Sequence, residues 1–340
     1  MPKWLKGIGP ESDIVISSRI RMARNIESIP FPHYLNEEKS QNIIDKVYTT
    51  ISSGNLSLKN DFSLIKMKES DVVDRLNYVE KHLISPALAR NTLGGAVLIN
   101  KEETISIMIN EEDHIRIQCL LPGLQLDKCL DIGDKIDDLL EENIKYTFDE
   151  QLGYLTSCPT NVGTGIRASV MVHLPALSLI GYINGVFHIA SKIGLAVRGI
   201  YGEGTQYLGN IYQISNQVTL GASEEELVNN LQNVTLQIIQ NERTARENLL
   251  KTKSIELEDK VFRSYGTLKQ ARLLSSNEAM QLISDVKLGV NLELIKEVST
   301  EKLNELIAII QPGYLQKYFK SELTGIERDI KRAQLVRESL

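Results

Sequence analysis

The stretch from Cys158 to Ser169 joins a thiol, a glycine-rich turn and an arginine that begins an alternating pattern. Neighbouring cations or backbone N–H groups can stabilise the thiolate form of such a cysteine. Gly163 and Gly165 allow the backbone to approach a ligand closely. From Arg167 onward polar and apolar residues alternate, so one face of the expected strand is apolar and the other presents a guanidinium group. This combination indicates an active site; a surface loop that leads into an ordinary half-buried strand is the alternative.

Arginines recur where expected strands meet loops, and they suggest an anion site. They are Arg19, Arg21, Arg116, Arg167 and Arg198. Guanidinium groups bind phosphate oxygens through paired, charge-assisted hydrogen bonds, and clustering them without an anion would be electrostatically costly. Each arginine taken singly would be a solvated surface group, but together they predict a nucleoside triphosphate site. No GxxxxGK[ST] loop and no HRD or DFG motif occurs, which excludes the common kinase folds.

The composition is typical of a soluble globular protein with one large and one smaller domain. The chain has 340 residues, 42% of them hydrophobic, and its net charge of -6 argues against a nucleic-acid binder. No run approaches the roughly 20 apolar residues of a membrane span, and the N-terminus lacks a signal-peptide core, so a cytoplasmic location is expected. Cys119, Cys129 and Cys158 form no CxxC pair, which favours reduced thiols over a zinc site or disulfides.

The hydrophobic pattern predicts an α+β fold, with an antiparallel β-sheet flanked by helices, because its strands come as adjacent, hairpin-like runs rather than strict βαβ units. Ser223 and Glu226 form a capping box that begins a long helix. Helices are expected over 36–53, 71–85, much of 125–146 and after Pro175, and strands over 96–100, 104–110, 114–121, 195–200 and from 167 onward.

Beyond about residue 250 the strand pattern fades. This change predicts one domain over 1–248 and a C-terminal α-helical domain over 249–340. In the second domain, apolar residues recur at helical spacing over 279–283, 292–298 and 303–310.

Four motifs resemble those of the phosphagen (ATP:guanido) kinase catalytic domain, in the order of that family and over roughly residues 15 to 245. They are Ser17–Arg21, Asn110–Arg116, Cys158–Ser169 and Arg198–Glu203. The resemblance implies a phosphagen kinase/glutamine synthetase-like catalytic domain.

More narrowly, the chain is similar to the bacterial protein arginine kinases of the McsB type. These have a shortened kinase domain and a helical domain with an RDxxRA motif, which residues 328–333 match. The SSRIR motif begins at residue 17, so the helical domain that precedes the sheet in small-guanidine kinases is not expected here. The guanidinium pocket is therefore expected to be open enough to admit an arginine attached to a protein.

The resemblance implies a catalytic set in which Glu112 is the general base, Glu203 clamps the other edge of the guanidinium, and Cys158 tunes it electrostatically. Glu111 and Asp113 are further candidates for orientation or water-mediated Mg²⁺ contact, and no side chain is expected to ligate a metal directly. ATP would be bound by Ser17, Ser18, Arg19, Ile20, Arg21, His82, Arg116, Arg167, Ala168, Ser169, Val170, Met171, Arg198, Gly199, Ile200, Tyr201, Gly202 and Glu203.

At two positions the chain departs from the small-guanidine relatives. These have Arg where this chain has Tyr201, and an acid where it has Gln206. One phosphate contact and one carboxylate of those relatives are thus missing here.

The C-terminal motif implies a second, noncatalytic site that binds phosphoarginine and links autophosphorylation to activity or assembly. Its residues would be Arg328, Asp329, Arg332 and Ala333. Like charges four residues apart on a helix repel by about 0.2 to 0.5 kcal/mol, and a bound anion would reverse the sign. A solvated charged helix face is the alternative.

The resemblance thus implies transfer of the ATP γ-phosphoryl group, with Mg²⁺, to arginine residues of proteins, marking them for stress regulation and Clp-dependent degradation. Implied partners are unfolded proteins, a stress-gene repressor, a zinc-bearing activator protein, Clp protease components and a second copy of the chain; neither nucleic acid nor a membrane is expected. Two alternatives stay open: a kinase of free arginine, and a noncatalytic adaptor that delivers phosphoarginine proteins to a protease.

Overall fold

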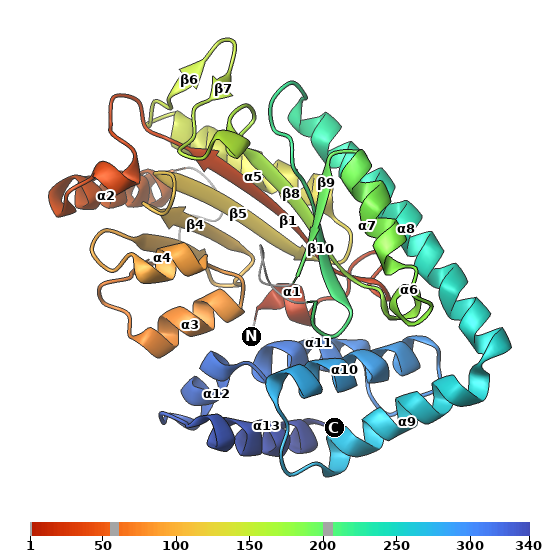
Figure 1. The fold of residues 1–340 in the computed structure, drawn as a ribbon. Helices are drawn as coiled ribbons and strands as arrows, with labels where there is room; N and C mark the ends of the chain where they lie inside the picture. Colours follow the sequence, from red (N-terminus) through yellow and green to blue (C-terminus); the bar gives the residue numbers. More distant parts are fainter. Residues whose placement is uncertain (1, 55–60, 200–206) are drawn as a thin grey trace.

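The computed structural model describes residues 2–54, 61–199 and 207–340. Its centre is an antiparallel sheet whose eight described strands follow the order β2-β3-β4-β5-β1-β8-β10-β9 (Figure 1). A separate hairpin pairs β6 (Phe148–Asp149) with β7 (Gly153–Tyr154). The prediction of an antiparallel sheet flanked by helices is confirmed. The strands of the main sheet are β1 (Val15–Arg24), β2 (Phe62–Lys66), β3 (Ala96–Asn100), β4 (Ile105–Ile109), β5 (Ile115–Pro122), β8 (Ile166–His173), β9 (Leu195–Arg198) and β10 (Ile211–Asn216).

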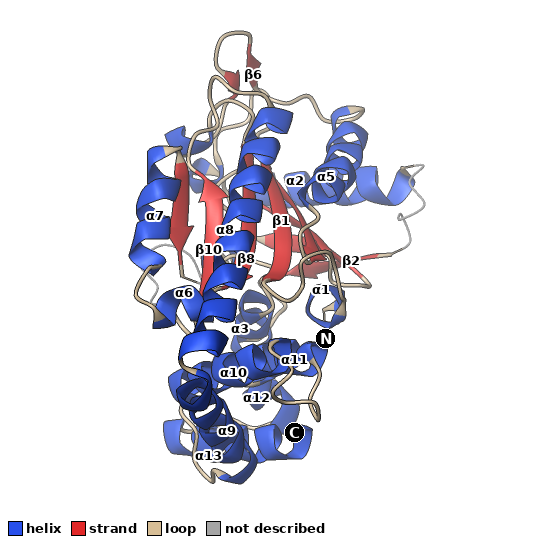
Figure 2. Ribbon diagram, turned by 90° about the vertical axis from the view of Figure 1, so that its right-hand side faces the viewer, coloured by secondary structure: helices blue, strands red, loops and turns tan. Residues whose placement is uncertain are grey.

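Helices cover the sheet and bury its apolar face. Helix α5 packs against β1 and β5, α2 packs against α5 and β4, and α8 packs against β8 and β10 (Figure 2). Gly133 of α5 permits the close approach, since a Cβ there would lie 2.9 Å from Met22 Cε. The helices of this part are α1 (Lys3–Lys6), α2 (Glu37–Ser53), α3 (Val72–Glu80), α4 (Pro86–Arg90), α5 (Leu126–Glu141), α6 (Pro175–Leu179), α7 (Ile183–Lys192) and α8 (Glu224–Thr252).

The expected capping box begins α8. Ser223 Oγ accepts from Glu226 N at 3.1 Å, and Glu226 Oε2 accepts from Ser223 N at 2.8 Å. The helix then continues through residue 248 and ends at Thr252. The domain boundary at 248 stays a prediction.

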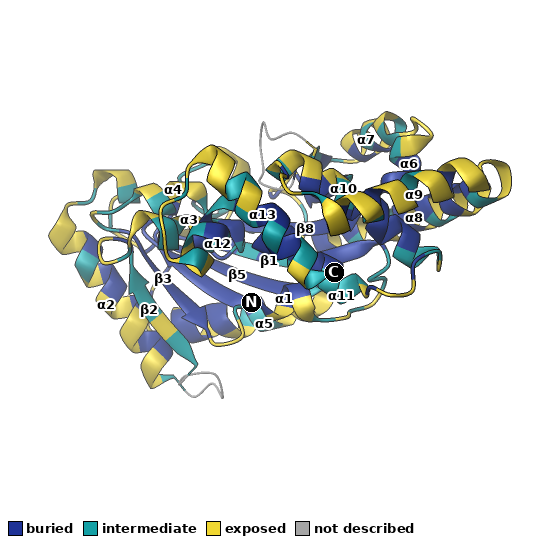
Figure 3. Cartoon of the chain, turned by 90° about the horizontal axis from the view of Figure 1, so that it is seen from below, coloured by how far each residue is buried: buried dark blue, intermediate teal, exposed yellow. Residues whose placement is uncertain are grey.

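The C-terminal part is helical and lies below the sheet in Figure 1, against α1, α3 and α6. Viewed from that side, buried residues concentrate on the strands while the outer helix faces are exposed (Figure 3). The expectation of helical structure over 292–298 is wrong, because α10 ends at Asn291 and Glu293 has a φ of 61°. The helices are α9 (Ser254–Gln270), α10 (Ser276–Asn291), α11 (Thr300–Ile309), α12 (Pro312–Phe319) and α13 (Gly325–Ser339).

Strand register decides which residues share the open face of the sheet. In β1, Ile20 and Met22 point into the core and are 1% and 0% exposed, so Arg19 and Arg21 point to the other face. Arg21 lies opposite Arg167 of β8. On the other side of β1, Ala23 lies opposite Arg116 of β5. Antiparallel pairing thus brings arginines from three strands to one place.

Two further observations concern the whole described chain. No helix within the described residues is both long and apolar enough to cross a membrane. Cys119 and Cys129 are buried free thiols, and Cys158 is a partly buried one.

Candidate active site

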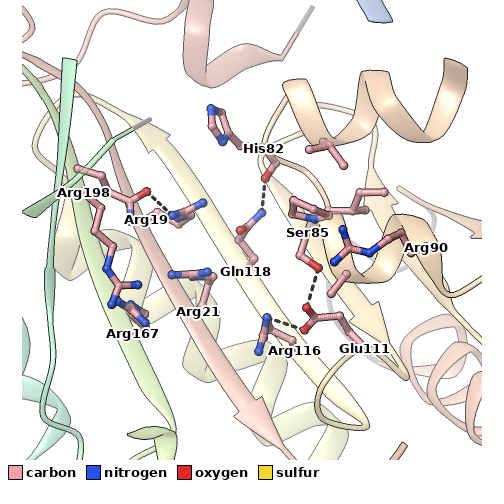
Figure 4. Close-up of a pocket in the computed structure, with 15 residues that line it drawn as sticks. Arg19, Arg21, His82, Ser85, Arg90, Glu111, Arg116, Gln118, Arg167 and Arg198 are labelled. Carbon is pink, nitrogen blue, oxygen red and sulfur yellow. Dashed lines mark hydrogen bonds and ion pairs between the residues drawn. The ribbon is translucent and has the colours of Figure 1, made fainter. Parts of the chain in front are cut away.

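The open face of the sheet carries a cavity of about 510 Å³ that is rich in arginine (Figure 4). Residues from β1, β5, β8, β9 and β10 form its floor, and α4 with the segment before it forms one wall. The five arginines singled out in the sequence all line it, together with Arg90. The lining residues are Arg19, Arg21, Val79, His82, Ile84, Ser85, Pro86, Ala87, Arg90, Glu111, Arg116, Gln118, Arg167, Arg198 and Gln213.

Arg19 is held by neutral side chains. Its Nη2 donates to Gln213 Oε1 at 2.6 Å and its Nε donates to Ser169 Oγ at 3.2 Å. Burial, and then the charges of Arg167 and Arg116, lower the pKa of Arg19 to about 10. A neutral frame orients this guanidinium without neutralising it.

Arg21 lies in the middle of the cluster. Its Nε is buried without a hydrogen-bond partner among the described residues. Burial lowers its pKa well below the ordinary value, and the charges of Arg19, Arg116 and Arg167 lower it further. The cavity is therefore a site of concentrated positive charge that a bound anion would relieve.

Arg116 has two carboxylate partners on the turn that precedes its strand. Its Nη1 lies 2.5 Å from Glu111 Oε2, and its Nη2 donates to Glu112 Oε2 at 2.8 Å. Burial opposes its charge, but Glu111, Asp113 and Glu112 outweigh burial and raise its pKa. Glu111 also accepts from Ser85 Oγ at 2.6 Å, which fixes the acidic turn against the start of α4.

His82 lines this cavity, and its contact with a nucleotide stays a prediction. Burial, with the charges of Arg19 and Arg21, lowers its pKa to about 3, so the imidazole is neutral at physiological pH. Its carbonyl accepts from Gln118 Nε2 at 2.8 Å. Its backbone is left-handed, with a φ of 57°.

A second cavity of about 260 Å³ adjoins the first and contains the predicted catalytic thiol and carboxylate. The two cavities share Arg21, Arg116, Arg167 and Arg198. The second is also lined by Ala23, Glu112, Cys158, Thr160, Asn161 and Gly165.

Glu112 and Cys158 belong to segments far apart in the sequence that this cavity brings together. The Glu112 side chain is 43% exposed, so its carboxylate is accessible from the cavity. Cys158 Sγ lies 3.0 Å from Thr160 Oγ1. An accessible carboxylate, a thiol and shared arginines can orient a guanidinium beside a phosphoryl group.

The two glycines of this loop have a local role. Both have positive φ, 117° at Gly163 and 67° at Gly165. A Cβ at Gly163 would lie 2.2 Å from Thr219 O, and one at Gly165 would lie 2.7 Å from Ala23 O. The close backbone approach expected for a ligand is made here to the chain itself.

Arg24 holds the same loop against the core. Its Nε donates to Asp137 Oδ2 at 2.8 Å, its Nη1 donates to Thr164 O at 2.9 Å, and it lies 3.6 Å from the Tyr154 ring centroid. The sequence analysis did not single it out, since a buried partner on α5 leaves no signature near position 24.

Several residues expected to bind nucleotide face away from the cavity. Ile20, Ala168 and Val170 have fully buried side chains in the core, because they alternate with the arginines along their strands. Ser18 Oγ donates to Gly123 O at 2.8 Å and accepts from Gln125 N at 2.9 Å, and so anchors the start of α5. The side chains of Ile20, Ala168, Val170 and Ser18 therefore do not line the cavity, which corrects the expectation that these residues bind ATP through their side chains.

The remaining residues that the sequence analysis expected to bind ATP fall into two groups. Ser17, Met171 and Gly199 are buried, and none of them lines either cavity. Ile200, Tyr201, Gly202, Glu203 and Gln206 lie outside the described residues. The role of Glu203 stays a prediction.

The polar lining residues that the sequence analysis did not assign to the site are Ser85, Arg90, Gln118 and Gln213. Gln118 shares its strand face with Arg116, so alternation could have indicated it. Arg90 has no motif around it. Within the described ranges, no three His, Cys, Asp or Glu side chains cluster as a metal site.

The C-terminal RDxxRA residues have different environments. Arg332 is 2% exposed, and its Nε and Nη1 donate to Ile310 O and Leu274 O, each at 2.7 Å. Its Nη1 also lies 2.5 Å from Asp329 Oδ1. Ala333 is fully buried, whereas Arg328 is partly exposed. The alternative of a solvated charged helix face is wrong for Arg332, whose guanidinium donates to backbone carbonyls. The phosphoarginine site itself stays a prediction.

Family models match both parts of the chain. Residues 42–245 match "ATP:guanido phosphotransferase, C-terminal catalytic domain", and residues 254–340 match "Protein-arginine kinase McsB C-terminal domain".

Curated relatives match nearly the whole chain. A protein-arginine kinase of Geobacillus sp. (strain WCH70) is 54% identical over 99% of this chain and 93% of the relative. Those of Caldanaerobacter subterraneus subsp. tengcongensis and Bacillus subtilis (strain 168) are 53% and 51% identical, covering 97% and 100% of this chain and 98% and 93% of the relatives.

Solved structures share the fold. Taurocyamine kinase from Schistosoma mansoni with bound transition-state analogue components superposes with a TM-score of 0.63 at 26% identity, over 76% of this chain and 38% of that one. Lombricine kinase superposes with a TM-score of 0.61 at 26% identity, over 72% of this chain and 70% of that one.

Proposed function

The chain belongs to the ATP:guanido phosphotransferase family and, within it, to the protein-arginine kinases, and from this premise we propose that it transfers the ATP γ-phosphoryl group to arginine side chains of proteins. One observation carries the proposal. Two adjoining cavities share Arg21, Arg116, Arg167 and Arg198, so a phosphoryl group between them would meet the same guanidinium groups before and after transfer. Fixed positive charge of this kind stabilises the loose transition state of phosphoryl transfer.

The larger cavity takes the nucleotide, and the smaller takes the acceptor arginine. Neutral His82 at the rim can contact the nucleoside without adding charge. Arg19, framed by Ser169 and Gln213, holds the phosphates together with the shared arginines.

A guanidinium is a poor nucleophile until it loses a proton. In the proposed step Glu112 accepts that proton while a guanidino nitrogen forms a bond to the γ-phosphorus and the bond from this phosphorus to the ADP oxygen breaks. Cys158, which lines the same cavity, tunes the charge of the guanidinium without forming a covalent bond. Glu203 would hold the other edge of the acceptor.

Mg²⁺ fits this donor set only as part of the nucleotide complex. Glu111 is already engaged by Arg116 and Ser85, and among the described acidic and imidazole groups none forms a three-ligand cluster. Of the two carboxylates expected to contact Mg²⁺ through water, Glu111 lines the larger cavity and would hold the ion through its water ligands, whereas Asp113 is fully buried and lines neither cavity. When bound, Mg²⁺ supplies charge neutralisation on the phosphates.

The test of the carboxylate roles replaces Glu112 and, separately, Glu203 by Gln. We expect phosphoarginine formation on an unfolded protein substrate to fall by about 10²- to 10⁴-fold in each variant. Mass spectrometry that preserves acid-labile N–P bonds measures it. Glu142→Gln, at an exposed site beyond α5, is the matched control. Full activity in both variants would remove the proposed roles.

The same assay separates the substrate classes. Incubation with ATP, Mg²⁺ and an excess of free arginine over protein substrate should still label the protein. Labelling of free arginine alone would favour a small-guanidine kinase, and no labelling of either would favour an adaptor.

We further propose that Arg328 and Asp329 take part in a noncatalytic phosphoarginine site on α13 that links autophosphorylation to activity. Arg328 is the informative position because it is partly exposed, whereas Arg332 already holds two carbonyls. Calorimetry with free phosphoarginine should show at least tenfold weaker binding in Arg328→Ala, about 1.4 kcal/mol. Lys331→Ala is the control, and equal binding by parent and Arg328→Ala would contradict the site.

We also propose a cellular location, substrates and partners for this enzyme. The chain would act in the cytoplasm on unfolded proteins and a stress-gene repressor, in company with a zinc-bearing activator and Clp protease components, and as a homodimer. Light scattering tests the oligomeric state. Detection of phosphoarginine in cells, on the repressor or on proteins bound to the protease, tests the proposed substrates and partners.

A further inference from the structure

The two walls of the acceptor cavity are joined by a buried hydrogen-bond network that has no access to the cavity. One wall is the turn of residues 111–113 between β4 and β5, which carries Glu112. The other is the loop of residues 155–158, which ends at Cys158. We propose that Asn25 and Asp113 are positioning residues that set the separation of these two walls and thereby the geometry in which the acceptor guanidinium is held.

Asp113 connects the two walls at the residues next to the cavity. Its side chain is fully buried and lines neither cavity. Its Oδ1 accepts from the Ser157 backbone N–H at 2.7 Å. Asp113 directly follows Glu112, and Ser157 directly precedes Cys158, so this one bond lies beside both predicted catalytic groups.

Asn25, the residue after β1, completes the network and is 2% exposed. Its Nδ2 donates to Asp113 Oδ1 at 2.7 Å and to Leu155 O at 3.1 Å. Its Oδ1 accepts from the His114 backbone N–H at 2.9 Å. The amide therefore binds each wall and ties both to the strand that carries Arg19 and Arg21.

The geometry assigns these residues to positioning. Neither side chain reaches the cavity, so neither can touch the substrate. A buried acceptor that loses its donor costs more than the bond itself contributes, so this network favours one arrangement of the walls. An error of about 1 Å in such an arrangement can reduce the rate by about 100-fold. The inference rests on the proposed function, because it assigns the acceptor to this cavity.

The test compares Asp113→Ala, Asn25→Ala and Asp113→Asn with the parent enzyme. Asparagine keeps an acceptor oxygen at the position of Oδ1 but removes the charge. We expect the two alanine variants to lower kcat/KM for protein arginine by about 10- to 100-fold while the KM for ATP changes little. Asp113→Asn should keep most of the parent activity. Asp127→Ala, on the exposed first turn of α5, is the matched control.

A second readout does not depend on activity. Cys119 and Cys129 are buried, so alkylation of the native protein by iodoacetamide reports on Cys158. Its rate, measured at a temperature at which every variant is folded, should change severalfold in the alanine variants and not in Asp113→Asn. If the parent lacks kinase activity, the proposed function fails, but this rate still tests the network.

Two outcomes would overturn the inference. If Asp113→Asn is as impaired as Asp113→Ala, the charge of Asp113, not its acceptor position, is what matters. If the alanine variants keep both parent kinetics for the acceptor and the parent alkylation rate, the network does not position the walls.

Discussion

Arg19 in the sheet is partly buried and Arg332 in α13 is buried, and the chain uses their guanidinium groups differently. Arg332 donates to Ile310 O and Leu274 O and is paired with Asp329. Among the described residues, Arg19 donates to neutral Ser169 and Gln213, and the charges that act on its pKa are those of Arg167 and Arg116. Burial lowers the pKa of both, but the charges around Arg332 include a paired carboxylate, whereas those around Arg19 lower its pKa further. The guanidinium of Arg332 stabilises the fold, whereas that of Arg19 is positioned to bind an anionic ligand.

The same contrast occurs within β1 itself. Arg24 is neutralised by Asp137 and stacks on Tyr154, whereas Arg21, three residues earlier, faces the cavity and other arginines. A buried arginine alone therefore does not indicate a site; a group of them around a cavity, with few carboxylates, does.

Among the tests of this comparison between arginines, the substitution Arg21→Ala is expected to have the largest effect, a loss of catalytic activity. Removing a guanidinium shared by both cavities should lower kcat by about 10²- to 10³-fold. Because Arg21 is repelled by its neighbours, the nucleotide-free variant should melt at the same temperature as the parent or higher. Kinase assays and thermal melts measure both. A lower melting temperature would show that Arg21 stabilises the empty fold, contrary to the comparison.

Arg332→Ala should have the opposite signature. It leaves the carbonyls of Ile310 and Leu274 without a donor, so the free energy of unfolding should fall by about 3 kcal/mol. Urea denaturation measures it. Arg328→Ala is the matched control and should change stability by no more than about 0.5 kcal/mol. Equal effects of the two substitutions would contradict the structural role of Arg332.

ATP should stabilise the parent protein, because its phosphates would neutralise the arginines that line the larger cavity on the sheet. At a free concentration of one hundred times Kd, the expected gain is about 2.7 kcal/mol. The gain should be smaller in Arg19→Ala at the same concentration and unchanged in Arg263→Ala, an exposed arginine on α9. Melting curves with and without ATP test this; an undiminished gain in Arg19→Ala would place the phosphates elsewhere.

The smallest effect concerns pH and His82. Its folded pKa of about 3 is below the unfolded value, so its stabilising contribution is present above about pH 6.5 and is lost as pH falls toward 3. His82→Gln should therefore lose less stability than the parent between pH 6.5 and 4. Urea midpoints at several pH values measure the difference. Parallel curves for the two proteins would show that His82 is not held neutral.

Much of this architecture could be predicted from the sequence. Alternation in 104–110 and 114–121 predicted β4 and β5, and Ser223 with Glu226 predicted the start of α8, because these signals are local. The same alternation assigned Arg167 and Ser169 to one face of β8. The prediction of a helix over 292–298 is wrong, because it rests on the helical spacing of apolar residues alone and α10 ends at Asn291.

The parts of the site that the sequence did not indicate depend on distant partners. Gln213 meets Arg19 across 194 residues, and Asn25 meets Asp113 across 88. Whether Arg24, Arg21 or Arg332 serves the fold or a ligand depends on Asp137, on neighbouring strands and on the carbonyls of Ile310 and Leu274, respectively. No local pattern encodes such contacts, since each is made only when the elements pack.

The sequence by itself determined the residue types, their periodicity along each strand and the motifs that identify the family. Only the tertiary structure decided which arginines keep their charge for a ligand. The reason is electrostatic: the state of a buried cation depends on the groups within a few ångströms, and antiparallel register and helix packing choose those groups.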